Sequence, residues 1–220
     1  MNQMNLEQAR YNMIEQQIRP WDVLDDQVLG VLSATPREDF APAQYRELAF
    51  SDICVPLADG QCMMPPKLEG RLLQSLAIQP EDDILEIGTG SGYLTACLAR
   101  LGNSVHSIEL FSGLTETARE QLARHNIGNV TLENGDAGAG WQAEKRYDAI
   151  AVTGSLPLLH KGYHELLNPG GRLFVIVGQP PIMQALLITR TGEQEWNSES
   201  LFETAIPALL NAPRPEDFRF

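Results

Sequence analysis

The chain has 220 residues, of which 43% are hydrophobic and 20% charged, so its composition suits a folded domain and excludes an intrinsically disordered chain. Its 29 acidic and 16 basic side chains give a formal net charge of −13. This charge argues against nucleic-acid partners, because their binding depends on Lys and Arg neutralising phosphates. It also argues against binding to anionic membrane surfaces.

The three cysteines, Cys54, Cys62 and Cys97, include no C-x-x-C pair, and their odd number does not suggest a disulfide framework. A reducing compartment is therefore expected, which favours the cytoplasm. The N-terminus lacks the basic and apolar pattern of a signal peptide. No apolar run approaches the roughly 18–20 residues that span a bilayer.

The first part of the chain predicts helices around an irregular segment. Apolar residues at near-helical spacing indicate a helix over residues 5–19 that ends at Pro20, and Asp25 or Asp26 can cap a second helix. Prolines and glycines make residues 41–66 irregular, and such a long loop inside a compact chain is often functional. A third helix is expected over residues 67–78.

From residue 83 onward, short apolar strands alternate with amphipathic helices. This order predicts a Rossmann-like α/β fold: a doubly wound, mostly parallel sheet with helices on both faces. Two weaker strands are expected to form an antiparallel hairpin at the sheet edge, turning near Gly192. The end of the chain contains two prolines and is expected to fray. The predicted strands are 84–87, 105–108, 130–132, 149–152, 173–177, 186–189 and 200–206, and the helices are 93–101, 112–125 and 157–167.

A glycine-rich loop, Glu86-Ile87-Gly88-Thr89-Gly90-Ser91-Gly92, joins the first of these strands to a helix. Glycines let the backbone turn tightly and approach a ligand, and ligands of such sheets bind at the carboxyl ends of the strands. Glu109 ends the second strand, where a carboxylate can accept both ribose hydroxyls. Asp136 ends the third strand and could accept from an adenine amino group. The pattern predicts an adenosine-type cofactor.

The spacing of the glycines favours S-adenosylmethionine over a dinucleotide. The dinucleotide fingerprint G-x-G-x-x-G would require glycine at Tyr93. The leading carboxylate, Glu86, would repel a pyrophosphate but suits a cationic ligand. A tight turn without any ligand is the structural alternative.

The pattern E-x-G-x-G-x-G resembles motif I of the class I methyltransferases. Further segments, in the same order and spacing over roughly residues 12–206, resemble the protein-L-isoaspartate O-methyltransferase family. The segments that carry this resemblance are 31–40, 85–93, 134–136 with 140–141, 147–153, and 170–173 with 177–178.

The resemblance implies a repair enzyme that methylates the free carboxylate of isoaspartyl residues in damaged proteins. The ester then collapses to a succinimide, which can reopen to aspartate. The acceptor carboxylate is already a nucleophile and the sulfonium an activated donor, so positioning and exclusion of water suffice and no metal is expected. The expected partner is a protein or peptide acceptor, with no nucleic acid or membrane, and the chain is expected to be a monomer or homodimer.

The resemblance also assigns roles to residues. The methionine part of the cofactor would be held at the glycine loop, the ribose at Glu109 and the adenine at Asp136 with Ala137. Thr153 would lie beside the transfer point. The expected cofactor residues are Glu86, Gly88, Thr89, Gly90, Ser91, Gly92, Glu109, Leu110, Asp136 and Ala137, and the expected acceptor residues are Gln61, Cys62, Met64, Pro66 and Gln184.

These roles divide the chain into three parts. Residues 1–80 would supply N-terminal helices and an acceptor loop packed on the core. Residues 81–210 would form the methyltransferase core, and 211–220 a flexible tail.

The acceptor loop departs from the family pattern. Family members read G-Q-T-I-S-x-P, whereas this chain has Cys62 at the threonine position and Met64 at the serine position, close to the donor methyl and the acceptor carboxylate. A thioether donates no hydrogen bond, and losing one donor weakens carboxylate binding by about 1–3 kcal/mol. Lys67, two residues after Pro65, is either a compensating cation or a solvated surface residue.

Three hypotheses follow. The chain is an isoaspartyl methyltransferase of reduced or altered activity, or a methyltransferase of the same lineage with another acceptor, or a non-catalytic cofactor-binding partner protein. Two side-chain features are interpreted conservatively. His160 and His164 stand four residues apart on a predicted helix but lack the carboxylate of a zinc motif. Cys62 has no obvious neighbouring cation and is interpreted as an inert, half-buried cysteine.

Overall fold

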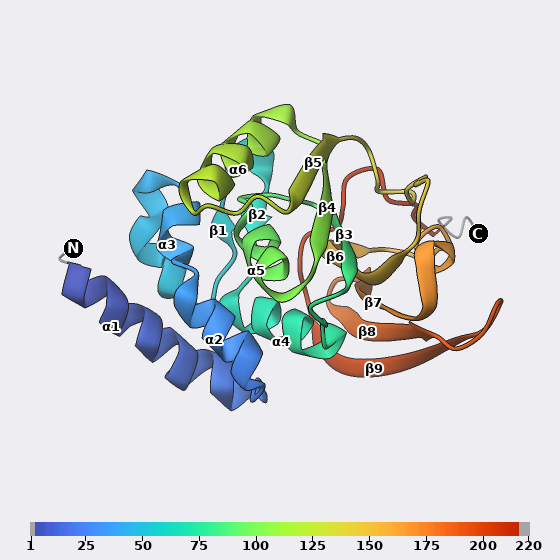
Figure 1. Ribbon diagram of the computed structural model, residues 1–220, viewed down its shortest axis with the longest axis horizontal. Helices are drawn as coiled ribbons and strands as arrows, with labels where there is room; N and C mark the ends of the chain where they lie inside the picture. Colours follow the sequence, from blue (N-terminus) through green and yellow to red (C-terminus); the bar gives the residue numbers. More distant parts are fainter. Residues whose placement is uncertain (1–2, 216–220) are drawn as a thin grey trace.

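The computed structural model describes residues 3–215, and its centre is a seven-stranded sheet (Figure 1). The strand order is β5-β4-β3-β6-β7-β8-β9. The first five strands in this order pair in parallel, and β8 and β9 add an antiparallel edge. The predicted Rossmann-like, mostly parallel sheet is thereby confirmed. The strands are β3 Asp83–Ile87, β4 Ser104–Glu109, β5 Val130–Asn134, β6 Tyr147–Leu156, β7 Leu167–Gln179, β8 Ile182–Arg190 and β9 Trp196–Thr204.

The first face of the sheet packs against α-helices. Ile84 of β3 and Ala149 of β6 point to this face and join a core cluster with Leu73 and Leu98. The helices are α2 Asp26–Ala34, α4 Pro66–Leu76, α5 Tyr93–Leu101 and α6 Ser112–Arg124. All four were predicted, and the side chain of Asp25 caps α2 by accepting from the backbone N–H of Gln27 and Val28.

The second face of the sheet is covered mainly by irregular backbone. Leu85 and Ile87 point to this face, where they pack with Tyr163 and Ala212. The predicted α-helix over residues 157–167 is wrong: only a 3-10 turn, η5 His164–Leu166, forms there. Gly162 explains the difference, because it lowers helix propensity and packs closely against the backbone of Gly140.

The N-terminal helix is longer and less regular than predicted. It runs through α1 Gln3–Met13, a π-helical segment η1 Ile14–Ile18 and a 3-10 turn η2 Arg19–Trp21. Pro20 therefore lies inside the last turn, and the helix ends where Asp22 adopts a left-handed conformation with φ of 58°.

The segment predicted to be irregular contains short elements. Strands β1 Val55–Pro56 and β2 Cys62–Met63 pair antiparallel, with η4 Ala58–Gly60 between them. The 3-10 helix η3 Ala43–Phe50 and the one-turn helix α3 Arg37–Phe40 precede them. This small hairpin is attached to the parallel sheet through α4, which follows it directly.

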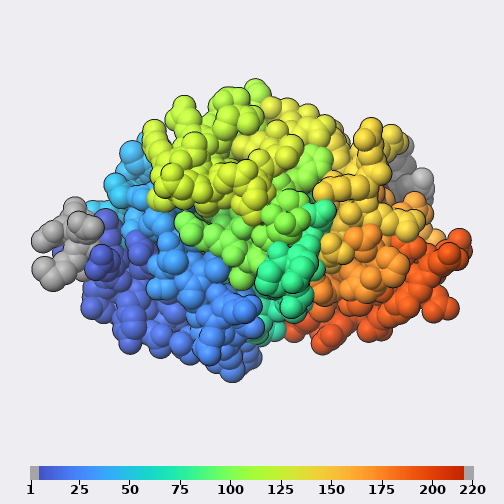
Figure 2. All heavy atoms as spheres, viewed as in Figure 1, coloured from blue at the N-terminus to red at the C-terminus, as the bar shows by residue number. Residues whose placement is uncertain are grey.

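The C-terminal hairpin of β8 and β9 is confirmed, and it turns through residues 191–195. Of the expected tail, residues 216–220 lie outside the described part of the chain. Of its described residues, Ala212 is 8% exposed and packs in the core of the second face, whereas Asn211 is exposed. In the space-filling view the N-terminal segments and the last strands occupy opposite ends of the visible face (Figure 2). No helix within residues 3–215 is long and apolar enough to cross a membrane.

Candidate active site

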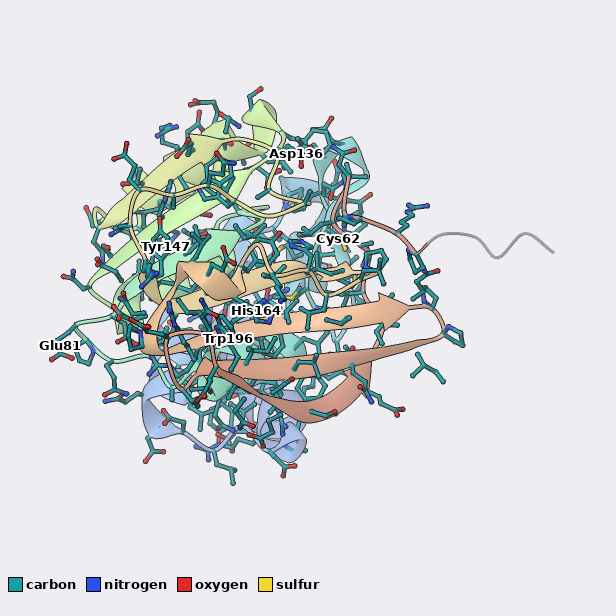
Figure 3. All side chains as sticks on the ribbon, turned by 90° about the vertical axis from the view of Figure 1, so that its right-hand side faces the viewer. Cys62, Glu81, Asp136, Tyr147, His164 and Trp196 are labelled. Atoms are coloured by element: carbon teal, nitrogen blue, oxygen red, sulfur yellow. The ribbon has the colours of Figure 1, made fainter. Side chains whose placement is uncertain are left out.

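A cleft opens at the carboxyl ends of the parallel strands. Its empty volume, including the part that opens to solvent, is about 990 Å³. Figure 3 shows Cys62 and Asp136 at this end of the sheet, whereas Glu81, which precedes β3, lies at the other. The cleft is lined by the β1–β2 hairpin, the glycine-rich loop, the ends of β4, β5 and β6, and residues 206–210.

The glycine-rich loop forms one wall of the cleft and requires its glycines. Gly88, Gly90 and Gly92 have φ of 94°, 54° and 82°, in the left-handed region that other residues rarely adopt. A Cβ on Gly88 would lie 2.3 Å from Oγ1 of Thr153. The predicted residues Gly88, Thr89, Gly90 and Ser91 all line the cleft, while Gly92 lies behind them at the start of α5.

Glu109 is fixed at the end of β4 by both of its carboxylate oxygens. Oε2 accepts from the backbone N–H of Gly90 at 2.9 Å, and Oε1 accepts from Phe111 N–H at 3.0 Å. Because a carboxylate oxygen has two lone pairs, each oxygen retains capacity for a ligand hydroxyl. Glu109 and its neighbour Leu110 line the cleft, as the sequence predicts.

Asp136 and Ala137 line the cleft beyond β5. One oxygen of Asp136 accepts from Gly138 N–H at 3.0 Å, and the other accepts from the Nδ2 of Asn211 at 2.7 Å. The second contact ties this loop to the C-terminal segment.

Residues 206–210 complete the cleft and were missed by sequence reasoning. Leu209 N–H donates to Ser155 O at 2.9 Å, and Ser155 N–H donates to Pro207 O at 3.0 Å. The segment therefore runs along the extended carboxyl end of β6. Its only sequence signal is that Gly138 and Gly154 leave room for it, since a Cβ on either would clash with the segment.

Glu86 does not line the cleft, which corrects its predicted contact with the methionine part. Its side chain is fully buried under α5, where the hydroxyls of Thr95 and Ser107 donate to one oxygen at 2.5 and 2.6 Å. The hydroxyls of Ser107 and Thr89 lie 2.6 Å apart, so Glu86 supports the loop through Ser107. Burial, partly offset by these hydrogen bonds, raises the pKa of Glu86 to about 8.

Thr153 lies at the cleft wall, where β6 passes the glycine loop. Its hydroxyl donates to the carbonyl oxygens of Ile87 and Gly88, at 2.9 and 2.8 Å. Because these two carbonyl oxygens take the hydroxyl proton, Thr153 holds the loop in position and has no proton left to donate to a substrate.

The hairpin β1–β2 forms the opposite end of the cleft. Gln61, Cys62 and Met64 line it as predicted, together with Cys54 and Glu69. Met64 is 8% exposed, so it borders the cleft and does not project across it.

A buried arginine fixes this end of the cleft. Arg37 donates to the carboxylate of Glu69 at 2.9 Å and to the carbonyl oxygens of Ala49 and Met64 at 2.6 Å each. Burial by itself would lower the pKa of the Arg37 guanidinium, but the charge of Glu69 raises it by more, so the pKa is raised overall. The ion pair leaves no free cation here.

Two predicted acceptor residues lie elsewhere. Pro66 is buried as the first residue of α4 and does not line the cleft. Gln184 is exposed on β8, opposite Val177, and does not line the cleft. Lys67 is a surface residue: its Nζ lies 2.6 Å from Asp52 and 4.1 Å from the ring centre of Trp21.

The cleft is acidic. Glu69, Glu109 and Asp136 line it, and no Lys, Arg or His among the described residues does so. No cluster of three or more metal-ligating His, Cys, Asp or Glu side chains occurs within residues 3–215. His164 packs against Trp196 away from the cleft, as Figure 3 shows, and His160 contacts Tyr163.

Comparison with known proteins shows the family of this chain. The family model described as Protein-L-isoaspartate(D-aspartate) O-methyltransferase matches residues 8–206. The protein-L-isoaspartate O-methyltransferase 1 of Geotalea uraniireducens is 35% identical over 209 residues, covering 94% of this chain and 95% of its own. The chain belongs to this methyltransferase family. A second relative, the protein-L-isoaspartate O-methyltransferase of Rhodopseudomonas palustris, is 36% identical and covers 91% of this chain and 92% of its own.

Solved structures share the fold of the family. A Plasmodium falciparum chain, described as a protein-L-isoaspartate O-methyltransferase in complex with S-adenosyl-L-homocysteine, superposes with a TM-score of 0.79 at 20% identity. The match covers 93% of this chain and 97% of that one. The departure of this methyltransferase at Cys62 and Met64 therefore lies within an otherwise preserved architecture, and both side chains still face the cleft.

Proposed function

We propose that this chain is an S-adenosylmethionine-dependent methyltransferase that esterifies the free carboxylate of isoaspartyl residues in damaged proteins. One observation carries the proposal. A single cleft joins the glycine loop and Glu109, which suit the cofactor, to the hairpin of Gln61 and Met64, which suits the acceptor. The family relatives named above support this activity over another acceptor or a non-catalytic role.

The cofactor half of the cleft fits S-adenosylmethionine. Glu109 would hold the ribose hydroxyls, and Asp136 with Ala137 the adenine, while Gly88 and Gly90 let the loop approach the methionine part. The acidic lining favours a sulfonium cation and disfavours a pyrophosphate. The binding of S-adenosyl-L-homocysteine by the Plasmodium protein supports the same cofactor.

The reaction needs little beyond alignment. A carboxylate oxygen of the acceptor attacks the methyl carbon of S-adenosylmethionine and the carbon–sulfur bond breaks. The electron pair of that bond stays on sulfur, so the sulfonium becomes the uncharged thioether of S-adenosylhomocysteine. No proton has to move. The protein therefore contributes in-line positioning and a dry cleft, which are worth about 7–11 kcal/mol in well-oriented reactions. Thr153 holds the loop that positions the donor, and Met64 lines the acceptor end.

The roles of the parts of the chain, its compartment and its partners belong to the same proposal. We expect residues 1–80 to act as the acceptor-binding part, packed on a core of residues 81–210. The three cysteines are all free, which supports a reducing cytoplasm. The net charge of −13 supports a protein or peptide acceptor and no nucleic acid, with the chain acting as a monomer or homodimer.

The direct test is transfer of a labelled methyl group to an isoaspartyl peptide and to its aspartyl twin. We expect a base-labile ester on the isoaspartyl peptide alone. Calorimetry with S-adenosyl-L-homocysteine tests the cofactor half separately. If S-adenosyl-L-homocysteine binds but no methyl group is transferred at high enzyme concentration, isoaspartyl residues are not the acceptor. If S-adenosyl-L-homocysteine does not bind, the proposal of a methyltransferase is rejected as a whole.

A further inference from the structure

Two cysteines that are eight residues apart in sequence meet at the acceptor end of the cleft. In the β1–β2 hairpin, Val55 pairs with Met63 and Pro56 pairs with Cys62. Val55 and Met63 point into the core, being 0% and 4% exposed. Because successive residues of an extended strand point to opposite faces, the other face of the hairpin carries Cys62 and, just before β1, Cys54.

Both thiols line the cleft, and both are half-buried. They are therefore reachable by a small molecule that enters the cleft. Cys97, the third cysteine, is buried in α5, and burial raises its pKa to about 12. The sequence shows three unremarkable cysteines, and only the hairpin brings two of them together.

The two thiols also differ in acidity. The neighbouring Cys62 thiol lowers the pKa of Cys54 to about 7; burial opposes this shift, and the nearby charge of Arg37 adds to it. The pKa of Cys62 is raised correspondingly. The pair thus loses its first proton near neutral pH, and the resulting thiolate is the nucleophilic form of cysteine.

We propose that Cys54 and Cys62 form an oxidisable dithiol site, in which hydrogen peroxide converts Cys54 to a sulfenic acid and Cys62 captures it as a disulfide. In the first step the Cys54 sulfur attacks one peroxide oxygen, the O–O bond breaks, and hydroxide leaves. In the second step the Cys62 sulfur attacks the sulfenic sulfur, the S–O bond breaks, and the hydroxide takes the Cys62 proton as water. In sum, two thiols and one peroxide give one disulfide and two waters.

The consequence for catalysis rests on the proposed function. Cys62 lies between Gln61 and Met63 in the hairpin that borders the acceptor, so a bond to Cys54 changes the shape of this end of the cleft. The cofactor residues Glu109 and Asp136 lie outside the hairpin. The disulfide should therefore block methyl transfer while leaving cofactor binding intact, and a thiol reductant should reverse it.

The site is tested by mass spectrometry, without any need for activity. After peroxide treatment and alkylation, we expect one alkylated thiol in place of three, loss of two hydrogens from the intact mass, and a crosslinked peptide joining Cys54 to Cys62. Cys97→Ala is the matched control and should form the same crosslink. Three remaining thiols, or a disulfide between two chains, would overturn the proposal.

The order of the steps is tested with a sulfenic-acid probe such as dimedone. In Cys62→Ser, which removes the capturing thiol, peroxide should leave a dimedone adduct on Cys54. In Cys54→Ser no adduct should form on Cys62. The reverse pattern of labelling would reject Cys54 as the attacking thiol. Thermal melting of both variants checks that they fold.

Activity supplies a second, separate readout. Oxidised wild type should transfer methyl to the isoaspartyl peptide about 100-fold more slowly than before treatment, a loss typical of a displaced reacting group, and dithiothreitol should restore the rate. S-adenosyl-L-homocysteine affinity should not change. Each cysteine variant is compared with its own untreated sample, and Cys54→Ser should resist peroxide. Full activity of the crosslinked protein would reject the regulatory role, whereas no activity before oxidation would reject the proposed function instead.

Discussion

At the scale of single residues, Glu109 connects the glycine loop to the expected ribose site. Its carboxylate accepts from Gly90 and Phe111, and charged acceptors of this kind contribute about 1.5–3 kcal/mol. Glu109→Gln keeps the shape but replaces one acceptor oxygen with a donor. We expect S-adenosyl-L-homocysteine affinity to fall about 10- to 100-fold by calorimetry. Glu116→Gln, on the exposed surface of α6, is the control and should bind as wild type does. Equal affinity of both variants would show that Glu109 does not hold the ligand.

Glu86 makes stability depend on pH. Its pKa is raised to about 8 in the folded chain by burial, above the ordinary value of 4.5. The folded state therefore keeps a proton that the unfolded state loses, so this contribution is complete below about pH 4.5 and is lost as pH rises toward 8. Within that window we expect up to about 1.4 kcal/mol of stability to be lost per pH unit. Glu86→Gln cannot ionise and should flatten the pH dependence of urea unfolding. Parallel pH profiles for the two proteins would contradict this.

Met64 tests how the acceptor end differs from the family pattern. It lines the cleft but carries no hydrogen-bond donor. Met64→Ser supplies a hydroxyl to the acceptor carboxylate, and a donor of this kind contributes about 1–3 kcal/mol in a dry site. We expect kcat/KM for the isoaspartyl peptide to rise by about 5- to 150-fold, with cofactor affinity unchanged. An unchanged kcat/KM would mean that Met64 does not contact the acceptor.

At the scale of elements, residues 206–210 act as one wall of the cleft. A Cβ at Gly138 would lie 2.2 Å from the carbonyl oxygen of Leu210, so Gly138→Ala must displace this segment. We expect S-adenosyl-L-homocysteine affinity to fall at least about tenfold, because Asp136 loses its contact with Asn211. Gly128→Ala, where no atom lies within 4 Å of the added Cβ, is the matched control. Wild-type affinity in Gly138→Ala would show that the segment does not shape the site.

The same elements show what the sequence could predict. The sequence located β3 and α5 because both are short, mostly apolar segments that are buried almost throughout. The glycine loop and Glu109 follow directly from the strand ends. The helix predicted over 157–167 failed because Gly162 packs against a distant loop, which periodicity does not register. Residues 206–210 and the Cys54–Cys62 pair also depend on contacts between segments far apart in the chain or across a hairpin turn. The buried position of Glu86 follows from strand alternation, but its motif suggested a direct contact.

At the scale of the whole molecule, the chain has a net charge of −13, and acidic side chains line its cleft. The resulting field attracts cationic substrates and raises their association rates. We therefore expect an isoaspartyl peptide with lysines on both sides to have a kcat/KM about tenfold above that of the same peptide with glutamates. The difference should nearly vanish at about 1 M salt, where the Debye length is only about 3 Å. The assay is initial-rate methyl transfer for both peptides at low and high salt, with S-adenosyl-L-homocysteine affinity as the control for effects of salt on the donor. Two results would contradict this: a higher kcat/KM for the glutamate peptide, or a ratio of the two kcat/KM values that salt does not change. Either would mean that contacts within the cleft, and not the overall charge, determine which peptide is preferred.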